Sequence, residues 1–273
     1  ASLLSRELGT KLTGRHIRYE LFPFSFREFL KLTAQEPSSD SFQEYFVKGG
    51  FPEHLKTGKA EILQELLNDI LARDIAVRHN IKSIKALKEM ALYLLTNSGK
   101  EFSYNSLKKT FGLGSVNSAI AFVSYFEDSY LLFTVSKFDY SLKKQLVAPK
   151  KVYSIDNGLS KVNSASFSDD RGKMLENIVF LNLRKQFRYI FYFQQKNECD
   201  FVVKEGTKIT KAVQACYELN DDNKEREING LSEAMNKFGL KEGIILTYNQ
   251  EDMLKAGGRK IIVKPVWKWL LGK

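Results

Sequence analysis

Cysteine is nearly absent from this chain, with only Cys199 and Cys216 among 273 residues. Their spacing fits neither a zinc site nor a disulfide framework, so a reducing compartment is the simpler interpretation. No apolar run is long enough to span a bilayer, and the first residues lack the charged-then-apolar layout of a secretion signal. These absences predict a soluble cytoplasmic protein with no membrane partner.

A phosphate-binding P-loop is also absent. In the pattern G-x-x-x-x-G-K-S/T the glycine-rich backbone surrounds the phosphates and the hydroxyl binds the metal ion. The Gly-Lys pairs at Gly58, Gly99 and Gly172 all lack both the leading glycine and the trailing hydroxyl. The sequence as given therefore does not predict ATP binding.

Lysine and arginine outnumber aspartate and glutamate by 42 to 32, which gives a formal net charge of +10. Such an excess favours contact with polyanions, although many soluble basic proteins bind none. From the composition we therefore expect DNA as a partner, bound without sequence specificity.

The pattern of elements divides the chain into three parts. Residues 1–60 are too short to bury a core of their own and contain a polar linker, Gln35 to Ser41. Ser25 followed three residues later by Glu28 has the spacing of a capping box, which predicts a helix from Ser25 to Leu32. Residues 61–160 should form a linker helix and a second domain, and residues 161–273 a third.

The middle part has the element order of a winged helix. An amphipathic helix over Glu61 to His79 precedes a helix over 84–95, a third through Leu107 and Phe111, and a fourth that begins after Ser115. Two strands follow, over 130–135 and 151–155, with residues 138–150 as the wing between them.

This predicted winged helix lacks the side chains that usually read DNA bases. The fourth helix carries no lysine or arginine between Ser115 and Ser129, so base-specific contacts are not expected. Lysines on the preceding helix and around the wing would contact phosphates instead: Lys108, Lys109, Lys143, Lys144, Lys150 and Lys151. The alternative is a winged helix with a purely structural role.

The stretch from Gly172 to Leu219 contains the candidate residues of a functional site. It predicts one helix, with Glu176 on its apolar stripe, followed by three strands in which Asp200 faces Gln214 across a hairpin. Carboxylates at the margin of an apolar sheet are costly unless they pair or bind a cation. We therefore expect a site here, within an α/β sheet flanked by helices.

Two stretches near the start resemble one known family. LLSRELGTKLTGR followed by YELFPFSFREFL, together with the Gly49–Glu53 turn, is similar to the tail of the ATPase domain in archaeal and bacterial AAA-type ATPases. The resemblance implies that residues 1–60 are an incomplete ATPase domain, with ATP bound only if a P-loop lies upstream, and with homo-oligomers formed through the ATPase part. It also implies that Arg15 lies near the nucleotide; the alternative is a surface arginine after a helix.

The C-terminal part resembles the PD-(D/E)XK restriction-endonuclease-like fold, a mixed sheet flanked by helices. The residues that carry this likeness lie in Leu175–Asn177, Glu198–Val203 and Val213–Cys216, with Gly172 before them. Over most of the chain the sequence also looks like the domain of unknown function that follows the ATPase in that family.

In active nucleases of this fold a helix glutamate, an aspartate and an E-x-K pair hold Mg²⁺ and activate water. By this resemblance Glu176 and Asp200 match the first two and are the candidate Mg²⁺ ligands. Gln214 occupies the E-x-K glutamate and Cys216 its lysine. Glutamine removes a negative charge and cysteine supplies no positive charge, so we expect a degraded catalytic site.

Three functions follow from these features. The favoured one is a nucleic-acid-interacting module whose nuclease-like domain does not cut. The alternatives are an active Mg²⁺-dependent DNA or RNA hydrolase and a protein-interaction adaptor. Whether the chain is an enzyme stays open, because fold likeness does not decide activity.

Overall fold

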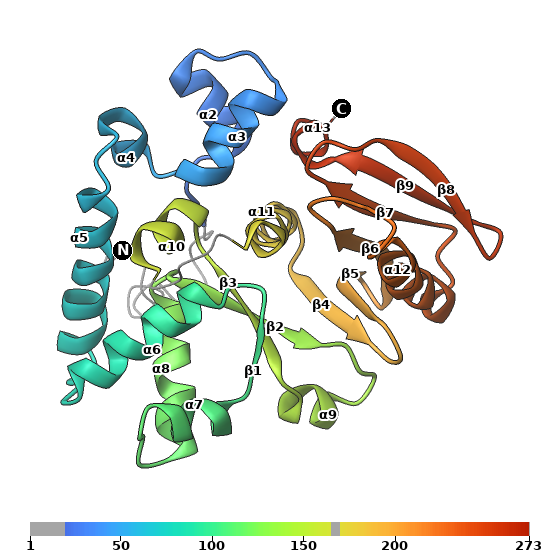
Figure 1. The fold of residues 1–273 in the computed structure, drawn as a ribbon. Coiled ribbons are helices and arrows are strands. Elements are labelled where there is room, and N and C mark those ends of the chain that lie inside the picture. Colours follow the sequence, from blue (N-terminus) through green and yellow to red (C-terminus); the bar gives the residue numbers. More distant parts are fainter. Residues whose placement is uncertain (1–19, 165–169, 273) are drawn as a thin grey trace.

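The computed structural model describes residues 20–164 and 170–272. They form an α/β structure in which helices flank one mixed sheet of nine strands (Figure 1). The α/β class predicted from the sequence is confirmed at this level. Arg15 and the other predictions for residues 1–19 lie outside the described residues.

The first described elements are helical. They are α2 (Phe26–Thr33), α3 (Ser39–Lys48), α4 (Pro52–Thr57), α5 (Glu61–Asp69), the π-helical segment η2 (Ile70–Val77) and α6 (Ile84–Thr96). The capping box at the start of α2 is confirmed, because the Ser25 hydroxyl accepts from the Glu28 N–H and the Glu28 carboxylate accepts from the Ser25 N–H. The helix predicted over 61–79 changes from α to π hydrogen bonding at Ile70.

The next elements run in the order β1 (Glu101–Phe102), α7 (Tyr104–Thr110), α8 (Val116–Asp128), β2 (Leu132–Lys137), α9 (Leu142–Val147) and β3 (Lys150–Ser154). The segment predicted as a wing loop thus contains a short helix, α9. This helix was not predicted from the sequence, because its apolar side chains do not face the core. Leu142, Leu146 and Val147 are all exposed.

The C-terminal elements alternate strands and helices. They are α10 (Asn157–Asn163), α11 (Arg171–Gln186), β4 (Tyr189–Gln194), β5 (Glu198–Glu205), β6 (Lys208–Ala215), α12 (Lys224–Phe238), β7 (Glu242–Thr247), β8 (Asp252–Ala256), β9 (Arg259–Pro265) and α13 (Val266–Leu270). Strand β8 was missed in the sequence because its side chains are exposed or half-buried, with no apolar alternation.

The sheet is continuous across the whole described chain, in the order β1-β3-β2-β4-β5-β6-β7-β9-β8. Strand β2 pairs in parallel with β4 through Ser136↔Phe191 and Lys137↔Tyr192. Strands on both sides of residue 160 therefore belong to one sheet, and β3 lies close enough to β5 to share a site with it. The division into 1–60, 61–160 and 161–273 stays a prediction.

Two apolar clusters cover the two faces of the sheet. The larger one joins the helices that precede α11 in the chain to α11 itself. Within it the rings of Phe180 and Tyr153 stack, with 4.4 Å between their centroids. The smaller one lies between α12 and the strands, around Leu231 and Met235. Among the described residues, no helix combines the length and apolar character needed to cross a bilayer.

Candidate functional site

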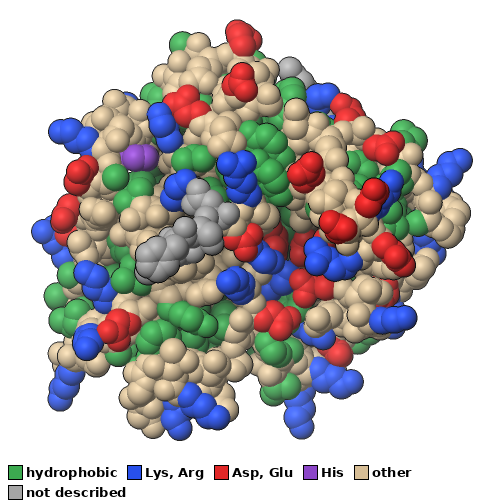
Figure 2. Space-filling model, in the orientation of Figure 1, with side chains coloured by type: hydrophobic (Ala, Val, Ile, Leu, Met, Phe, Trp, Pro, Cys, Tyr) green, Lys and Arg blue, Asp and Glu red, His purple; other side chains and the backbone are tan. Residues whose placement is uncertain are grey.

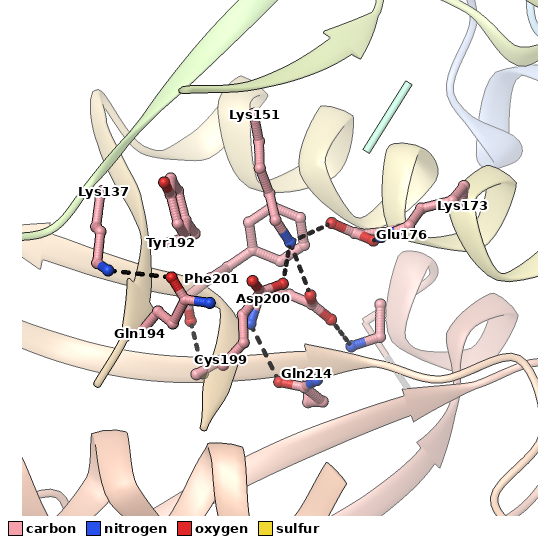
Figure 3. A network of polar contacts seen from close by, with 12 residues as sticks. Lys137, Lys151, Lys173, Glu176, Tyr192, Gln194, Cys199, Asp200, Phe201 and Gln214 are labelled. Carbon is pink, nitrogen blue, oxygen red and sulfur yellow. Dashed lines mark hydrogen bonds and ion pairs between the residues drawn. The ribbon is translucent and has the colours of Figure 1, made fainter. Parts of the chain in front are cut away.

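The ammonium group of Lys151 lies between three carboxylates. Its Nζ is 2.6 Å from Glu198 Oε1, 3.0 Å from Glu176 Oε1 and 3.1 Å from Asp200 Oδ1 (Figure 3). The side chains of Lys151, Glu176 and Asp200 are only 2%, 3% and 7% exposed. Removing such charges from water costs several kcal/mol per ion, and close pairing offsets that cost.

Three elements position these groups. Lys151 comes from β3, Glu176 from the second turn of α11, and Asp200 from β5. Helix α11 starts at an N-cap, where the Asp170 carboxylate accepts from the Lys173 N–H at 3.1 Å. Lys151 also lies 5.7 Å from the centre of the Tyr192 ring, so its alkyl chain and ammonium are enclosed by protein.

Both oxygens of Glu176 are occupied. Oε1 accepts from the Tyr153 hydroxyl at 2.7 Å as well as from Lys151, and Oε2 accepts from Lys173 Nζ at 2.7 Å. Gly99 leaves the room for this arrangement, since a Cβ there would lie 2.6 Å from Lys173 Cδ. Glu176 is therefore held by two cations and a phenol.

The oxygens of Asp200 are occupied too. Oδ1 accepts from Lys151, and Oδ2 accepts from the Ala215 main-chain N–H at 3.0 Å. The Asp200 main-chain N–H donates to Gln214 Oε1 at 3.1 Å, which confirms that these two residues face each other across the hairpin. The Gln214 amide points away from Lys151, toward α12, where its Nε2 donates to Glu227 Oε2 at 2.6 Å.

The pKa values of the two buried carboxyl groups, Asp200 and Glu176, are shifted in opposite directions. Burial and the neighbouring Glu176 charge raise the pKa of Asp200 to about 7. Burial also opposes ionisation of Glu176, but Lys151 and Lys173 outweigh it and hold the pKa of that carboxyl below its usual value. Burial opposes the charge of Lys151, but Tyr153 and the surrounding carboxylates outweigh it and keep the pKa of Lys151 well above that of a free lysine. Lys151 is therefore charged throughout the physiological pH range.

The carboxylates around Lys151, but not Lys151 itself, line one cavity of about 710 Å³. Glu176, Asp200, Gln214 and Cys216 all reach it, and Lys196 and Arg226 contribute positive charge. On the face drawn in Figure 2, acidic and basic side chains are mixed around the centre of the molecule. Burial and nearby Glu227 raise the pKa of the Cys216 thiol to about 12, so it stays protonated and is a poor nucleophile.

The arrangement does not fit a Mg²⁺ ion between Glu176 and Asp200. The position where the carboxylates converge is taken by Lys151 Nζ, and the remaining oxygens accept from protein donors. Within residues 20–164 and 170–272, no group of three or more His, Cys, Asp or Glu side chains is arranged to hold a metal ion. Mg²⁺ binding by these two residues stays an untested prediction.

The structure brings together some of the predicted residues and separates others. Glu176 and Asp200 meet at Lys151, whereas Gln214 and Cys216 lie on the α12 side of the same hairpin. Four of the lysines predicted to bind nucleic acid lie elsewhere: Lys108 and Lys109 are on α7, and Lys143 and Lys144 on α9. They do not line the cavity.

Sequence reasoning counted Lys151 among the wing lysines that would contact phosphates, which is wrong because its side chain is only 2% exposed, and it gave no role to Glu198 or Glu227. Lys151 precedes the buried run Val152 to Ile155, and a lysine that opens an otherwise apolar buried strand was a usable signal. Glu198 lies two residues before Asp200 and so reaches the same place. Glu227, 5% exposed on α12, had no such signal, because its partner Gln214 is not ionisable.

Comparisons with known proteins found a family model and relatives that are similar to this chain. A family model described as a domain of unknown function, DUF8612, matches residues 39–168. The uncharacterized protein MJ1544 of Methanocaldococcus jannaschii is 35% identical over 99% of this chain and 67% of its own length. An uncharacterized protein of Haemophilus influenzae is 28% identical over 99% of this chain and 69% of its own length. No solved structure matches the chain.

These comparisons correct the resemblance to AAA-type ATPases. The family model and both relatives carry no ATPase description, and the relatives align over 99% of this chain. The interpretation of the chain as the C-terminal part of an AAA-type ATPase is therefore wrong. Its motifs have local structural roles instead: Ser25 and Glu28 cap a helix, and the Gly50 N–H donates to the buried Asp156 carboxylate at 2.6 Å.

Proposed function

This chain belongs to the same family as the uncharacterized protein MJ1544, and we propose that it binds nucleic acid without cutting it. The observation that carries the proposal is the Lys151 ammonium among Glu176, Glu198 and Asp200. A permanent internal cation at this place satisfies the carboxylates that would otherwise hold a metal ion. The cytoplasm is the proposed location, supported by two cysteines that are both free thiols.

A nuclease-like ancestry of the site is supported by its element order. Helix α11 supplies Glu176, the hairpin β5–β6 supplies Asp200 and Gln214, and α12 covers the other side of the sheet. We propose that this half has a PD-(D/E)XK-like fold, because the residues that resemble that family lie at one cavity. The degraded positions Gln214 and Cys216 lie in that same cavity.

A winged helix is proposed for the segment before it. The order α6, β1, α7, α8, β2, β3 and the strand order β1-β3-β2 support this assignment. Basic side chains project along the lower edge of the face drawn in Figure 2, where Figure 1 places α7 and α9. Lys108 and Lys109 on α7, and Lys143 and Lys144 on α9, are the proposed phosphate contacts.

Salt dependence of binding tests the proposal. We expect a labelled DNA duplex to bind the chain with an affinity that falls steeply as salt rises, because each neutralised phosphate releases counterions. Changing the four lysines on α7 and α9 to glutamine should weaken binding and flatten the salt slope. The matched control changes four exposed lysines outside these helices, Lys56, Lys59, Lys241 and Lys255, which should leave the slope closer to that of the unmodified chain.

The proposal fails if the unmodified chain binds no nucleic acid, or if its affinity is the same at 50 mM and several hundred millimolar salt. It also fails if bound DNA or RNA is cut in the presence of Mg²⁺ or Mn²⁺. Cleavage that disappears in Asp200→Ala would instead support the second candidate.

That second candidate is a phosphodiester hydrolase, and one observation favours it. Lys151 brings an ammonium within 3.1 Å of Asp200, and so supplies from β3 the positive charge that Cys216, directly after β6, does not supply. The lysine of an active site of this kind need not come from the same strand, because only its position in space matters. The misfit to a metal ion described above weighs against this candidate.

A further inference from the structure

A broad groove of about 1090 Å³ lies between α2 and the C-terminal end of α11, away from the Lys151 site. Five cationic side chains and two acidic ones line it. The cations are Arg27, Lys31, Arg184, Lys185 and Arg188, and the acids are Glu20 and Glu28. The lining therefore carries an excess of three positive charges, and none of the four lysines on α7 and α9 belongs to it.

Both acids of this groove are already used by the fold. Glu20 accepts from Arg184 in a two-pronged ion pair, with both N–O distances at 2.9 Å. Glu28 accepts from the main-chain N–H and the hydroxyl of Ser25, at 2.8 and 2.7 Å, and so caps α2. Because the lining still carries more cations than carboxylates, the groove remains attractive to an anion.

Lys185 is one of the five cations that line the groove. Its Nζ donates to the Pro23 carbonyl at 3.2 Å and lies 5.5 Å from the centre of the Phe22 ring. Surrounding protein atoms desolvate the ammonium and lower the pKa of Lys185. A bound phosphate would favour the charged form of this lysine and offset the desolvation.

Aromatic rings alternate with cations along the groove and beyond its end. Lys211 lies 5.5 Å from the Phe187 ring, which itself lines the groove. Arg188 and Lys204 each lie over the Tyr189 ring, 5.4 and 5.3 Å from its centre. Tyr189 is 45% exposed, so its side chain is accessible to a partner that displaces one of these cations. The basic surface thus extends from α2 to the hairpin β5–β6.

We propose that this α2–α11 groove binds single-stranded nucleic acid. The cations meet the phosphates and the exposed ring of Tyr189 stacks with a base, which is how single strands are held without sequence preference. A duplex keeps its bases stacked inside and offers none to the ring. This inference rests on the proposed function for the class of its ligand, nucleic acid. It assigns binding to the α2–α11 groove and not to α7 and α9.

The test compares three variants by fluorescence anisotropy with a labelled 20-nucleotide oligo-dT strand. The groove variant changes Lys31→Gln, Lys185→Gln and Arg188→Gln. The ring variant is Tyr189→Ala, and the control variant changes the exposed Lys56, Lys241 and Lys255 to glutamine. Thermal melting confirms that each is folded; if the triple variant melts early, Lys31→Gln with Arg188→Gln replaces it.

We expect the groove variant to bind the strand at least tenfold more weakly than the control. Its salt slope should fall by about 2, because three lost phosphate contacts count about 0.7 each on a single strand. Tyr189→Ala should weaken the single strand severalfold but leave inorganic polyphosphate, used as an anisotropy competitor, unaffected. An unchanged Tyr189→Ala affinity would overturn the stacking assignment and identify the groove as a general polyanion site.

Two failures are distinguishable. If the unmodified chain binds the strand and the groove variant binds it equally well, the inference is overturned while the proposed function stands. If the unmodified chain binds neither single strand nor duplex, the proposed function is overturned and this inference with it.

Discussion

Replacing Lys151 with methionine removes the ammonium group around which Glu176, Glu198 and Asp200 converge, and keeps a side chain of similar length. The first and last of these carboxylates are almost fully buried. Loss of one partner of a buried ion pair leaves an uncompensated charge and costs about 3–5 kcal/mol. We expect Lys151→Met to lower the free energy of unfolding by that amount at pH 8.

The cost should shrink at lower pH. At pH 5 Asp200 is protonated, because its pKa is raised to about 7, and Glu176 becomes easier to protonate once Lys151 no longer holds its pKa down. Neutral carboxyl groups need no counter-cation. The difference between the unmodified chain and Lys151→Met should therefore be smaller at pH 5 than at pH 8.

Urea unfolding followed by circular dichroism at pH 5 and pH 8 measures both quantities. The matched control is Lys85→Met, which removes an exposed lysine 3.9 Å from Glu89 and should change stability by less than about 1 kcal/mol. Adding Glu176→Gln and Asp200→Asn to Lys151→Met should restore part of the loss. A Lys151→Met effect below about 1 kcal/mol, or equal at both pH values, would refute the reasoning.

Three further changes test individual contacts by the same urea assay. Asp200 has a folded pKa above its unfolded value, so its contribution to stability is complete below about pH 4 and is lost as pH rises through about 7. The unmodified chain should thus lose stability relative to Asp200→Asn between pH 4 and 8, by an amount on the order of a few kcal/mol; a pH-independent difference would contradict this. Glu227→Ala deprives the buried Gln214 amide of its acceptor and should cost about 1–3 kcal/mol, whereas Glu227→Gln should cost less. Gly230→Ala places a Cβ 1.9 Å from the Glu198 main-chain oxygen and should destabilise the chain by more than about 2 kcal/mol; a neutral result would show that α12 shifts freely on β5.

Local chemistry made much of the fold predictable from the sequence. The capping box at Ser25, the serine N-cap of α8 at Ser115 and the strands that flank Gly206 depend on neighbours a few residues apart, and each is present. The apolar stripe of α11 likewise placed Glu176 on the buried side of its helix. Short-range hydrogen bonding and periodicity determine these features.

The centre of the candidate site was not predictable in the same way. Lys151 meets Glu176 and Asp200 only because β2 pairs with β4 and so brings β3 into reach of β5. No local pattern encodes a parallel pairing between strands about 55 residues apart. The sequence therefore indicated which carboxylates to examine, but the cation that neutralises them depends on tertiary structure.

The central claim is that the chain holds nucleic acid and leaves it intact. One gel measures both: an end-labelled single strand is incubated with the chain and Mg²⁺ or Mn²⁺, and half of each sample is deproteinised before loading. We predict a salt-sensitive shifted band in the untreated half and a full-length strand in the other. Shortened strands that are absent with Asp200→Ala would contradict the account, as would a strand that is never shifted.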